Sequence, residues 1–143
     1  MWHKITMPIA YLTRRASFCA SHRLHSPNLN DEQNARLFGK CNHPNGHGHN
    51  YEIEVTVRGS IDPKTGMIMN LSDLKTAIDQ SILAHVDHRH LNIDVEMLRG
   101  INPTAENIAV VFWRELDKSL PRGALHEVRV KETENNFAIY RGE

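Results

Sequence analysis

The chain has 143 residues, and its 17 Lys and Arg residues balance 17 Asp and Glu residues, with 10 His in addition. A content of 40% hydrophobic and 24% charged residues is typical of a globular protein and excludes a disordered, collagen-like or coiled-coil chain. The zero net charge also excludes broad capture of nucleic acid, because a surface that follows a phosphate backbone is usually strongly basic.

The length and the cysteine content indicate a single domain in a reducing compartment. Cys19 and Cys41 are too few for a disulfide framework in a chain of this size. The N-terminal segment has no apolar stretch of signal-peptide type, and no segment approaches the roughly 20 apolar residues of a membrane span. We therefore expect one domain over residues 1–143, with residues 1–10 as a loose leader, in a soluble cytoplasmic protein that contacts no membrane.

The first half of the chain predicts two strands with a short helix between them. Alternating apolar residues over 16–22 predict a strand with one apolar face. Residues 31–38 predict a helix, with Asn30 as its N-cap and Gly39 as its end. The clearest strand covers residues 51–58, where apolar and polar side chains alternate without interruption.

Two amphipathic helices and a hairpin follow. The first helix begins near Ser72 or Asp73 and carries apolar residues at helical spacing up to Ile82. The second helix begins after Thr104, its expected N-cap, and ends before Pro121. The final hairpin then pairs residues 125–132 with residues 137–140, around the turn formed by residues 133–136.

The order of the predicted elements is strand, strand, helix, helix, strand, strand. Strands joined by hairpins and separated from the helices favour an antiparallel α+β domain. A four-stranded sheet with open edges is poorly protected unless the edges pair with other chains. We therefore expect an oligomer that closes several sheets into a larger barrel.

The densest group of chemically active side chains lies in residues 41–51. His47 and His49 lie two residues apart at the start of the clearest strand, so both imidazoles project from the same face. His22 ends the apolar face of the first strand and is a candidate third ligand, although His25 and His43 compete for that place. Three imidazoles with a fourth position open are the arrangement of catalytic zinc, whereas a lone His-x-His pair is often only polar surface.

Three further positions could carry chemistry. Cys41 is either a buried structural thiol or, beside Lys40 and several histidines, a reactive thiolate. The Asp87–His88 pair is either a surface pair at a helix end or a carboxylate that orients an imidazole. Glu132 ends an otherwise apolar row of the last long strand, so it needs a partner such as a ligand with paired N–H donors.

Together these motifs resemble the 6-pyruvoyl-tetrahydropterin synthase family. The resemblance covers nearly all of residues 11–143, and the combination of an upstream Ser-His with a Cys-to-His-Gly-His segment is its most specific part. The matching segments are residues 14–24, 38–51, 65–71, 87–88, 104–107 and 131–133.

The resemblance implies a fold, an assembly and a reaction. The fold is the tunnelling fold, a four-stranded antiparallel sheet with two helices on one face. Three chains close a twelve-stranded barrel, and two rings stack into a homohexamer. The reaction converts 7,8-dihydroneopterin triphosphate to 6-pyruvoyl-tetrahydropterin with loss of triphosphate, which makes the enzyme a carbon–oxygen lyase of tetrahydrobiopterin biosynthesis.

The resemblance also implies the cofactors and the residues of the site. Zinc is the resident metal, and Mg²⁺ accompanies the triphosphate. The implied site residues are the zinc ligands His22, His47 and His49, the general base Cys41 with its relay Asp87 and His88, and the pterin-pocket residues Glu132, Thr104 and Glu106. Independently of the resemblance, Thr104 and Glu106 have a sufficient explanation as a helix start.

Two departures and three alternatives accompany the resemblance. His43 and His90 stand where the family more often has Asn or another polar residue, and neither replaces an implied site residue. The related 6-carboxy-tetrahydropterin synthase of the queuosine pathway typically has a shorter spacing than the five residues, 42–46, between the Cys and the first His here. A non-catalytic zinc- or pterin-binding module is a second alternative. A zinc hydrolase is disfavoured because the sequence has no His-Glu-x-x-His motif.

Overall fold

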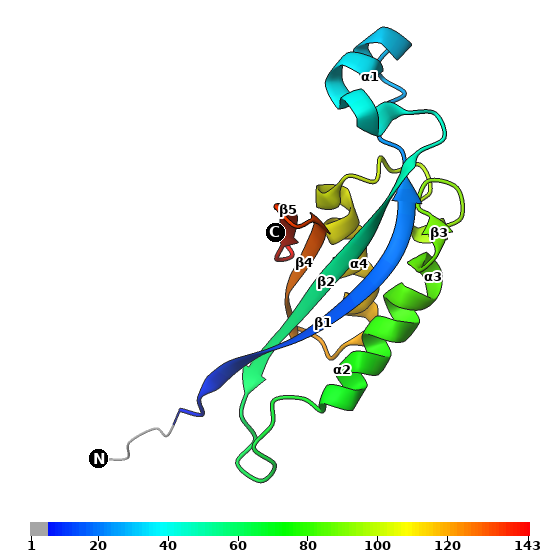
Figure 1. Cartoon of the computed structure of the whole chain (residues 1–143). Helices are drawn as coiled ribbons and strands as arrows, with labels where there is room; N and C mark the ends of the chain where they lie inside the picture. Colours follow the sequence, from blue (N-terminus) through cyan, green and yellow to red (C-terminus); the bar gives the residue numbers. More distant parts are fainter. Residues whose placement is uncertain (1–5) are drawn as a thin grey trace.

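The computed structural model describes residues 6–143, and its central feature is a long, twisted pair of strands, β1 and β2, in a mixed sheet (Figure 1). The strands are β1 (Ile9–His22), β2 (His47–Ser60), β3 (Arg89–His90), β4 (Leu125–Thr133) and β5 (Asn136–Tyr140), and the α-helices are α1 (Asp31–Phe38), α2 (Leu71–Ile78), α3 (Ala84–Val86) and α4 (Ala105–Ser119). A π-helical turn, Asp79–Leu83, joins α2 to α3, and 3₁₀ turns cover Gly39–Asn42 and Glu96–Leu98. The α+β class expected from the sequence is therefore confirmed.

The sheet has the strand order β3-β1-β2-β4-β5. Strands β1 and β2 are antiparallel in an unbroken register that runs from the pair Ile9–Ser60 to the pair His22–His47. The prediction of a loose leader is wrong for Ile9 and Ala10, because both pair with β2, and residues 1–5 lie outside the described part of the chain. The predicted start of this strand at residue 16 is seven residues late, because residues 9–15 are largely exposed and show no apolar alternation.

The prediction of a four-stranded antiparallel sheet needs one correction. The fifth strand, β3, contains only two residues, and it pairs parallel to β1 through Ala20–Arg89 and Ser21–His90. A two-residue strand is too short to show any periodic pattern in the sequence.

The predicted helices are present with nearly the expected ends. In α1, Asn30 is the N-cap, and Gln33 completes a capping box with it. Helix α2 begins at Leu71 rather than at Ser72 or Asp73, because the side chain of Asn70 accepts a hydrogen bond from the Ser72 backbone N–H. The N-cap of α4 is Thr104, as predicted. Within residues 6–143, no helix is both long and apolar enough to cross a membrane.

The hydrophobic core lies between one face of the sheet and the helices α2 and α4, which cover the same side of it (Figure 1). Its largest fully buried apolar side chains include Tyr51, Ile53 and Val55 from the sheet and Leu74, Ile78, Ile82, Ile108, Phe112 and Leu116 from helical segments. In β1, the buried row formed by Phe18 and Ala20 continues to His22, which is completely buried. The core face of the sheet therefore ends in an imidazole.

Candidate metal centre

Four side chains from three strands converge where this core face ends. His22 of β1, His47 and His49 of β2 and Glu132 of β4 each offer one ligand atom, and these four atoms all lie within 4.8 Å of one another. His25 and His43 are not members of this group. The structure thus brings His22, rather than its two competitors, to the His47–His49 pair.

The backbone explains this convergence. His22 lies opposite His47 in the β1–β2 register, and His49 projects from the same face as His47 because it lies two residues further along the strand. Gly46 precedes them with a φ of +76°, and an added Cβ would lie 2.8 Å from the carbonyl oxygen of His22 and 3.0 Å from Nε2 of His90. Only glycine therefore lets β2 begin this close to β1.

The orientation of the His22 ring is fixed from its Nδ1 side. Nδ1 lies 2.8 Å from the carbonyl oxygen of Pro103 and 3.2 Å from the buried hydroxyl of Tyr51. Because a carbonyl can only accept, the proton of the neutral ring is held at Nδ1, and Nε2 presents a lone pair. Burial, opposed by the Pro103 hydrogen bond and assisted by neighbouring imidazoles, lowers the pKa of His22 to about 4. The ring is therefore neutral at pH 7.

The other two imidazoles have polar atoms that lack partners. Among residues 6–143, the buried atoms Nδ1 of His47 and Nε2 of His49 make no hydrogen bond. Nε2 of His47 faces Nε2 of His22 at 3.2 Å. Burial, followed by the proximity of His47, lowers the pKa of His49. Three imidazoles that direct nitrogens to one point fit a borderline-soft divalent metal ion such as zinc.

Glu132 approaches the same point more closely than the sequence suggested. Its Oε1 lies 3.2 Å from Nε2 of His49, close enough for an ion pair but outside hydrogen-bond geometry, and 3.8 Å from Nε2 of His22. A shift in the β4–β5 register between Lys131 and Thr133 falls at this residue, and such bulges commonly redirect a side chain beside a functional site. Burial, and then the charge of Glu106, raises the pKa of Glu132. The sequence predicted a buried carboxylate here but gave no sign of its contact with the histidines.

A cavity of about 470 Å³ adjoins Glu132. Its lining includes Leu24 and Phe137 and all three residues that the family resemblance implies for the pterin pocket; the three are Glu132, Thr104 and Glu106. The hydroxyl of Thr104 accepts the Asn107 backbone N–H at 3.2 Å, so the residue caps α4 and lines the cavity at once. The volume lies within the range of roughly 300–1,000 Å³ that is usual for small-molecule sites.

Cys41 lies in the 3₁₀ turn that follows α1, as a free and partly buried thiol. Its carbonyl accepts the Leu24 backbone N–H at 2.8 Å, which ties this turn to the segment after His22. The pKa of Tyr51 is raised by burial first and then by the charges of Glu132 and Cys41, so the thiol lies within electrostatic reach of the His22 surroundings. Cys41 is not a member of the four-residue group.

The Asp87–His88 pair lies at the surface. Oδ1 of Asp87 is 3.0 Å from Nδ1 of His88 and also accepts the backbone N–H of Cys19, and this N–H is the main reason why the pKa of Asp87 is lowered. The His88 side chain is 80% exposed, and its φ is +59°. Within residues 6–143, no hydrogen bond or ion pair joins either residue to Cys41 or to the four-residue group.

A buried group of three imidazoles and a carboxylate on an α+β sheet defines a candidate metal-binding protein, and comparison with known proteins gives its family. A family model described as 6-pyruvoyl tetrahydropterin synthase matches residues 11–143. The 6-pyruvoyl tetrahydrobiopterin synthase of Homo sapiens is 54% identical over 134 residues, which cover 94% of this chain and 92% of that protein. The protein of the same name from Drosophila melanogaster is 48% identical over 136 residues, which cover 94% of this chain and 81% of that protein.

Comparison with solved structures points to the same family. The solved structure of Caenorhabditis elegans 6-pyruvoyl tetrahydropterin synthase matches with a TM-score of 0.91 at 42% identity, covering 96% of this chain and 98% of that one. The chain therefore belongs to the 6-pyruvoyl tetrahydropterin synthase family.

Proposed function

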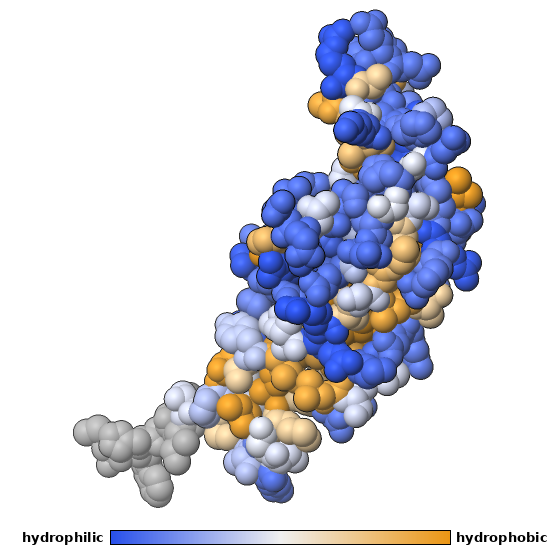
Figure 2. All heavy atoms as spheres, in the orientation of Figure 1, coloured by the Kyte–Doolittle hydropathy of each residue, from blue (hydrophilic) through white to orange (hydrophobic). Residues whose placement is uncertain are grey.

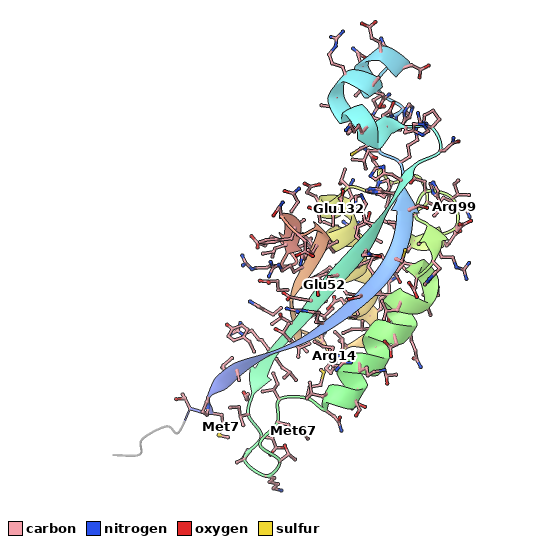
Figure 3. All side chains as sticks on the ribbon, in the orientation of Figure 1. Met7, Arg14, Glu52, Met67, Arg99 and Glu132 are labelled. Atoms are coloured by element: carbon pink, nitrogen blue, oxygen red, sulfur yellow. The ribbon has the colours of Figure 1, made fainter. Side chains whose placement is uncertain are left out.

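We propose that the chain is a zinc-dependent lyase that converts 7,8-dihydroneopterin triphosphate to 6-pyruvoyl-tetrahydropterin, with release of triphosphate, in tetrahydrobiopterin biosynthesis. The observation that carries this proposal is the convergence of His22, His47 and His49 beside the cavity that contains Glu132. Figure 3 labels Glu132 on β4, near the end of the sheet from which β1 leads towards α1. Family membership supports the assignment of substrate and product.

Each residue of the site has a distinct part in the reaction. Glu132 accepts two hydrogen bonds from the amino-pyrimidine edge of the pterin and thereby fixes which substrate carbon faces the thiol. Thr104 and Glu106 line the rest of the ring pocket. Cys41, as thiolate, removes a proton from the substrate side chain. The three imidazoles would hold zinc, which would supply Lewis-acid chemistry to the substrate side chain.

The Asp87–His88 pair acts as the proton relay of a neighbouring chain. The pair is exposed, and within the described residues no hydrogen bond or ion pair joins it to Cys41 of its own chain, which leaves it available to a thiol that another chain brings to it. This arrangement follows naturally if three chains close a twelve-stranded barrel. Mg²⁺ accompanies the triphosphate group, whose charge needs a counterion.

Exposed apolar side chains support assembly into a homohexamer. The edge strand β5 exposes Phe137 and Ile139, which is unusual for a strand that faces water in a monomer. An apolar groove of about 320 Å³, lined by residues that include Leu12, Ile61 and Met67, lies where β1 meets the loop after β2. In Figure 2 this end of the molecule carries the largest hydrophobic area of the visible face. The two free cysteines agree with residence in the cytoplasm.

The reaction is tested by incubating the purified protein with 7,8-dihydroneopterin triphosphate and identifying the products by mass spectrometry. We expect 6-pyruvoyl-tetrahydropterin and one triphosphate per turnover. A carboxy-pterin with released acetaldehyde would instead assign the chain to the queuosine-pathway reaction. Bound zinc without any turnover would show instead that the chain is a non-catalytic zinc- or pterin-binding module.

A further inference from the structure

A second cavity, of about 410 Å³, lies next to the metal centre but outside it. Arg23 and His25, which alternate with His22 and Leu24 along the chain, contribute to its lining, together with His90, Asn92 and Asn102. Pro27, Pro44, Ile93, Gly100 and Ile101 complete the wall. No carboxylate of the described chain, residues 6–143, lines this cavity; Asp94, which accepts the His90 backbone N–H, is not among its lining residues.

The hydrogen bonds around this cavity occupy the acceptor atoms of its two imidazoles. The side-chain amide of Asn42 donates to Nδ1 of His25 at 3.0 Å, and the backbone N–H of Asn92 donates to Nδ1 of His90 at 3.3 Å. Since each Nδ1 accepts, the proton of each neutral ring resides on Nε2. Both rings therefore offer an N–H donor.

The other polar side chains of the cavity also have more free donors than free acceptors. Nε of Arg23 donates to the carbonyl oxygen of Asn42 at 3.0 Å, which anchors the guanidinium and leaves its two NH₂ groups without a partner in the described chain. Oδ1 of Asn102 accepts the His25 backbone N–H, so the NH₂ group of Asn102 is left over. Both side-chain polar atoms of Asn92 are engaged by the Arg23 backbone. The cavity thus offers surplus donors and one permanent positive charge, and it has almost no free side-chain acceptor.

We infer that this cavity binds a phosphate or polyphosphate group. A planar guanidinium anchored through Nε presents its two NH₂ groups as a fork, which suits phosphate oxygens, and two imidazole N–H donors with an amide add neutral hydrogen bonds. The same side chains exclude a metal cation, because each of their nitrogens that has no partner carries a proton and therefore has no lone pair for a metal. The inference is independent of the proposed reaction, since it requires only that the anion binds.

The test is isothermal titration calorimetry with inorganic triphosphate and with inorganic phosphate, on the protein as purified with its metal. We expect saturable binding of triphosphate that weakens as salt is raised. Arg23→Met should weaken it by about tenfold or more, because one charge-assisted pair is lost. His25→Phe, which keeps a ring but removes Nε2–H, should weaken it about threefold, and Arg23→Lys should restore part of the loss.

Two controls decide whether the anion occupies this cavity. Arg14→Met removes an exposed arginine of β1 and should leave the affinity unchanged (Figure 3). His47→Ala weakens the metal centre and should also leave triphosphate binding unchanged. The inference is overturned if triphosphate does not bind, if Arg23→Met and His25→Phe bind it as the unaltered protein does, or if His47→Ala abolishes binding.

The source of the group is distinguished by steady-state inhibition. Inorganic triphosphate that competes with dihydroneopterin triphosphate identifies the cavity as the place of the substrate's own triphosphate. Inhibition that does not depend on substrate concentration identifies it as a site for a separate phosphate ligand. Both results require that the binding experiment has succeeded, so a failure of the proposed reaction leaves the binding result intact.

Discussion

Nδ1 of His22 lies 2.8 Å from the carbonyl oxygen of Pro103, in the segment that leads into α4. This contact joins the end of β1 to a residue 81 positions further along the chain and determines which nitrogen of the ring is free. A metal-binding imidazole commonly has its second nitrogen fixed by such a backbone or carboxylate acceptor. The fold thus leaves the lone pair of Nε2 of His22 available to a cation.

The first prediction concerns the pH dependence of stability in the metal-free protein. The pKa of His22 in the folded state is about 4, below the 6.5 of an unfolded histidine, so the unfolded state takes up a proton first as the pH falls. Stability is fully retained above pH 6.5 and is lost between pH 6.5 and pH 4, by about 3 kcal/mol for this residue. His49 shifts in the same direction.

Urea denaturation of the metal-free protein at pH 7.5, 6 and 5 measures this loss. His22→Gln, which cannot titrate, should flatten most of the pH dependence. If the unaltered protein is equally stable at pH 7.5 and pH 5, His22 is not buried in its neutral form.

Gly46 is the second target. Gly46→Ala places a Cβ 2.8 Å from the His22 carbonyl oxygen at a φ of +76°, so the strain adds to a clash with backbone. Gly123→Ala is a matched control, because its φ is +78° but nothing lies within 4 Å of the new Cβ. We expect the control to lose about 1 kcal/mol of stability, and Gly46→Ala to lose about 3 kcal/mol together with at least tenfold in zinc affinity. Equal effects of the two substitutions on zinc affinity would show that the approach of β2 to β1 does not shape the metal centre.

Glu132 provides the third prediction, because it lies close enough to the imidazoles to be either a ligand anchor or a metal ligand. We expect Glu132→Gln to retain about one zinc per chain, as three imidazoles suffice, and to raise the Kd for pterin by about tenfold to a hundredfold. Glu52→Gln is the control, since Glu52 forms ion pairs with Arg15 and Lys131 elsewhere on the sheet (Figure 3). Loss of zinc from Glu132→Gln alone would instead make this carboxylate a metal ligand.

The fourth prediction concerns the relay. Cys41→Ala and His88→Ala should each be inactive alone. When the two are mixed, dissociated and reassembled, about one site in four should combine an intact Cys41 with an intact His88, provided that the residues come from different chains. Recovery of about a quarter of the activity is the expected result, measured as triphosphate release. No recovery, in mixtures that native mass spectrometry shows to contain both variants, would place both residues in one chain.

Much of the fold was readable from local signals. The structure contains the elements predicted from the alternation along residues 51–58 and from the capping residues Asn30 and Thr104. Burial of one face of a strand requires an alternating pattern, and the unpaired N–H groups at a helix start favour capping residues, so both features are visible in the sequence. Residues 9–15 show no such alternating pattern. They are held in β1 by backbone pairing with β2, while their side chains are mostly polar or exposed.

The site shows the same division between local and non-local information. The spacing of His47 and His49 predicted a shared face, but the choice of His22 over His25 depended on the β1–β2 register, which a single strand pattern does not specify. The contact between Glu132 and His49 depends in addition on a bulge in β4. The sequence left open whether the Asp87–His88 pair lies at the surface, and the structure shows an exposed His88 beside an Asp87 carboxylate that accepts the backbone N–H of Cys19.

The central claim, that Cys41 is the base of a zinc-dependent elimination, is tested most directly by measuring zinc content and triphosphate release on the same samples of Cys41→Ala. Cys19→Ala, which alters the other free thiol, is the control. We predict that both variants hold about one zinc per chain, that Cys19→Ala keeps its rate, and that Cys41→Ala loses about a hundredfold or more. Triphosphate release by Cys41→Ala at the unaltered rate would contradict the claim.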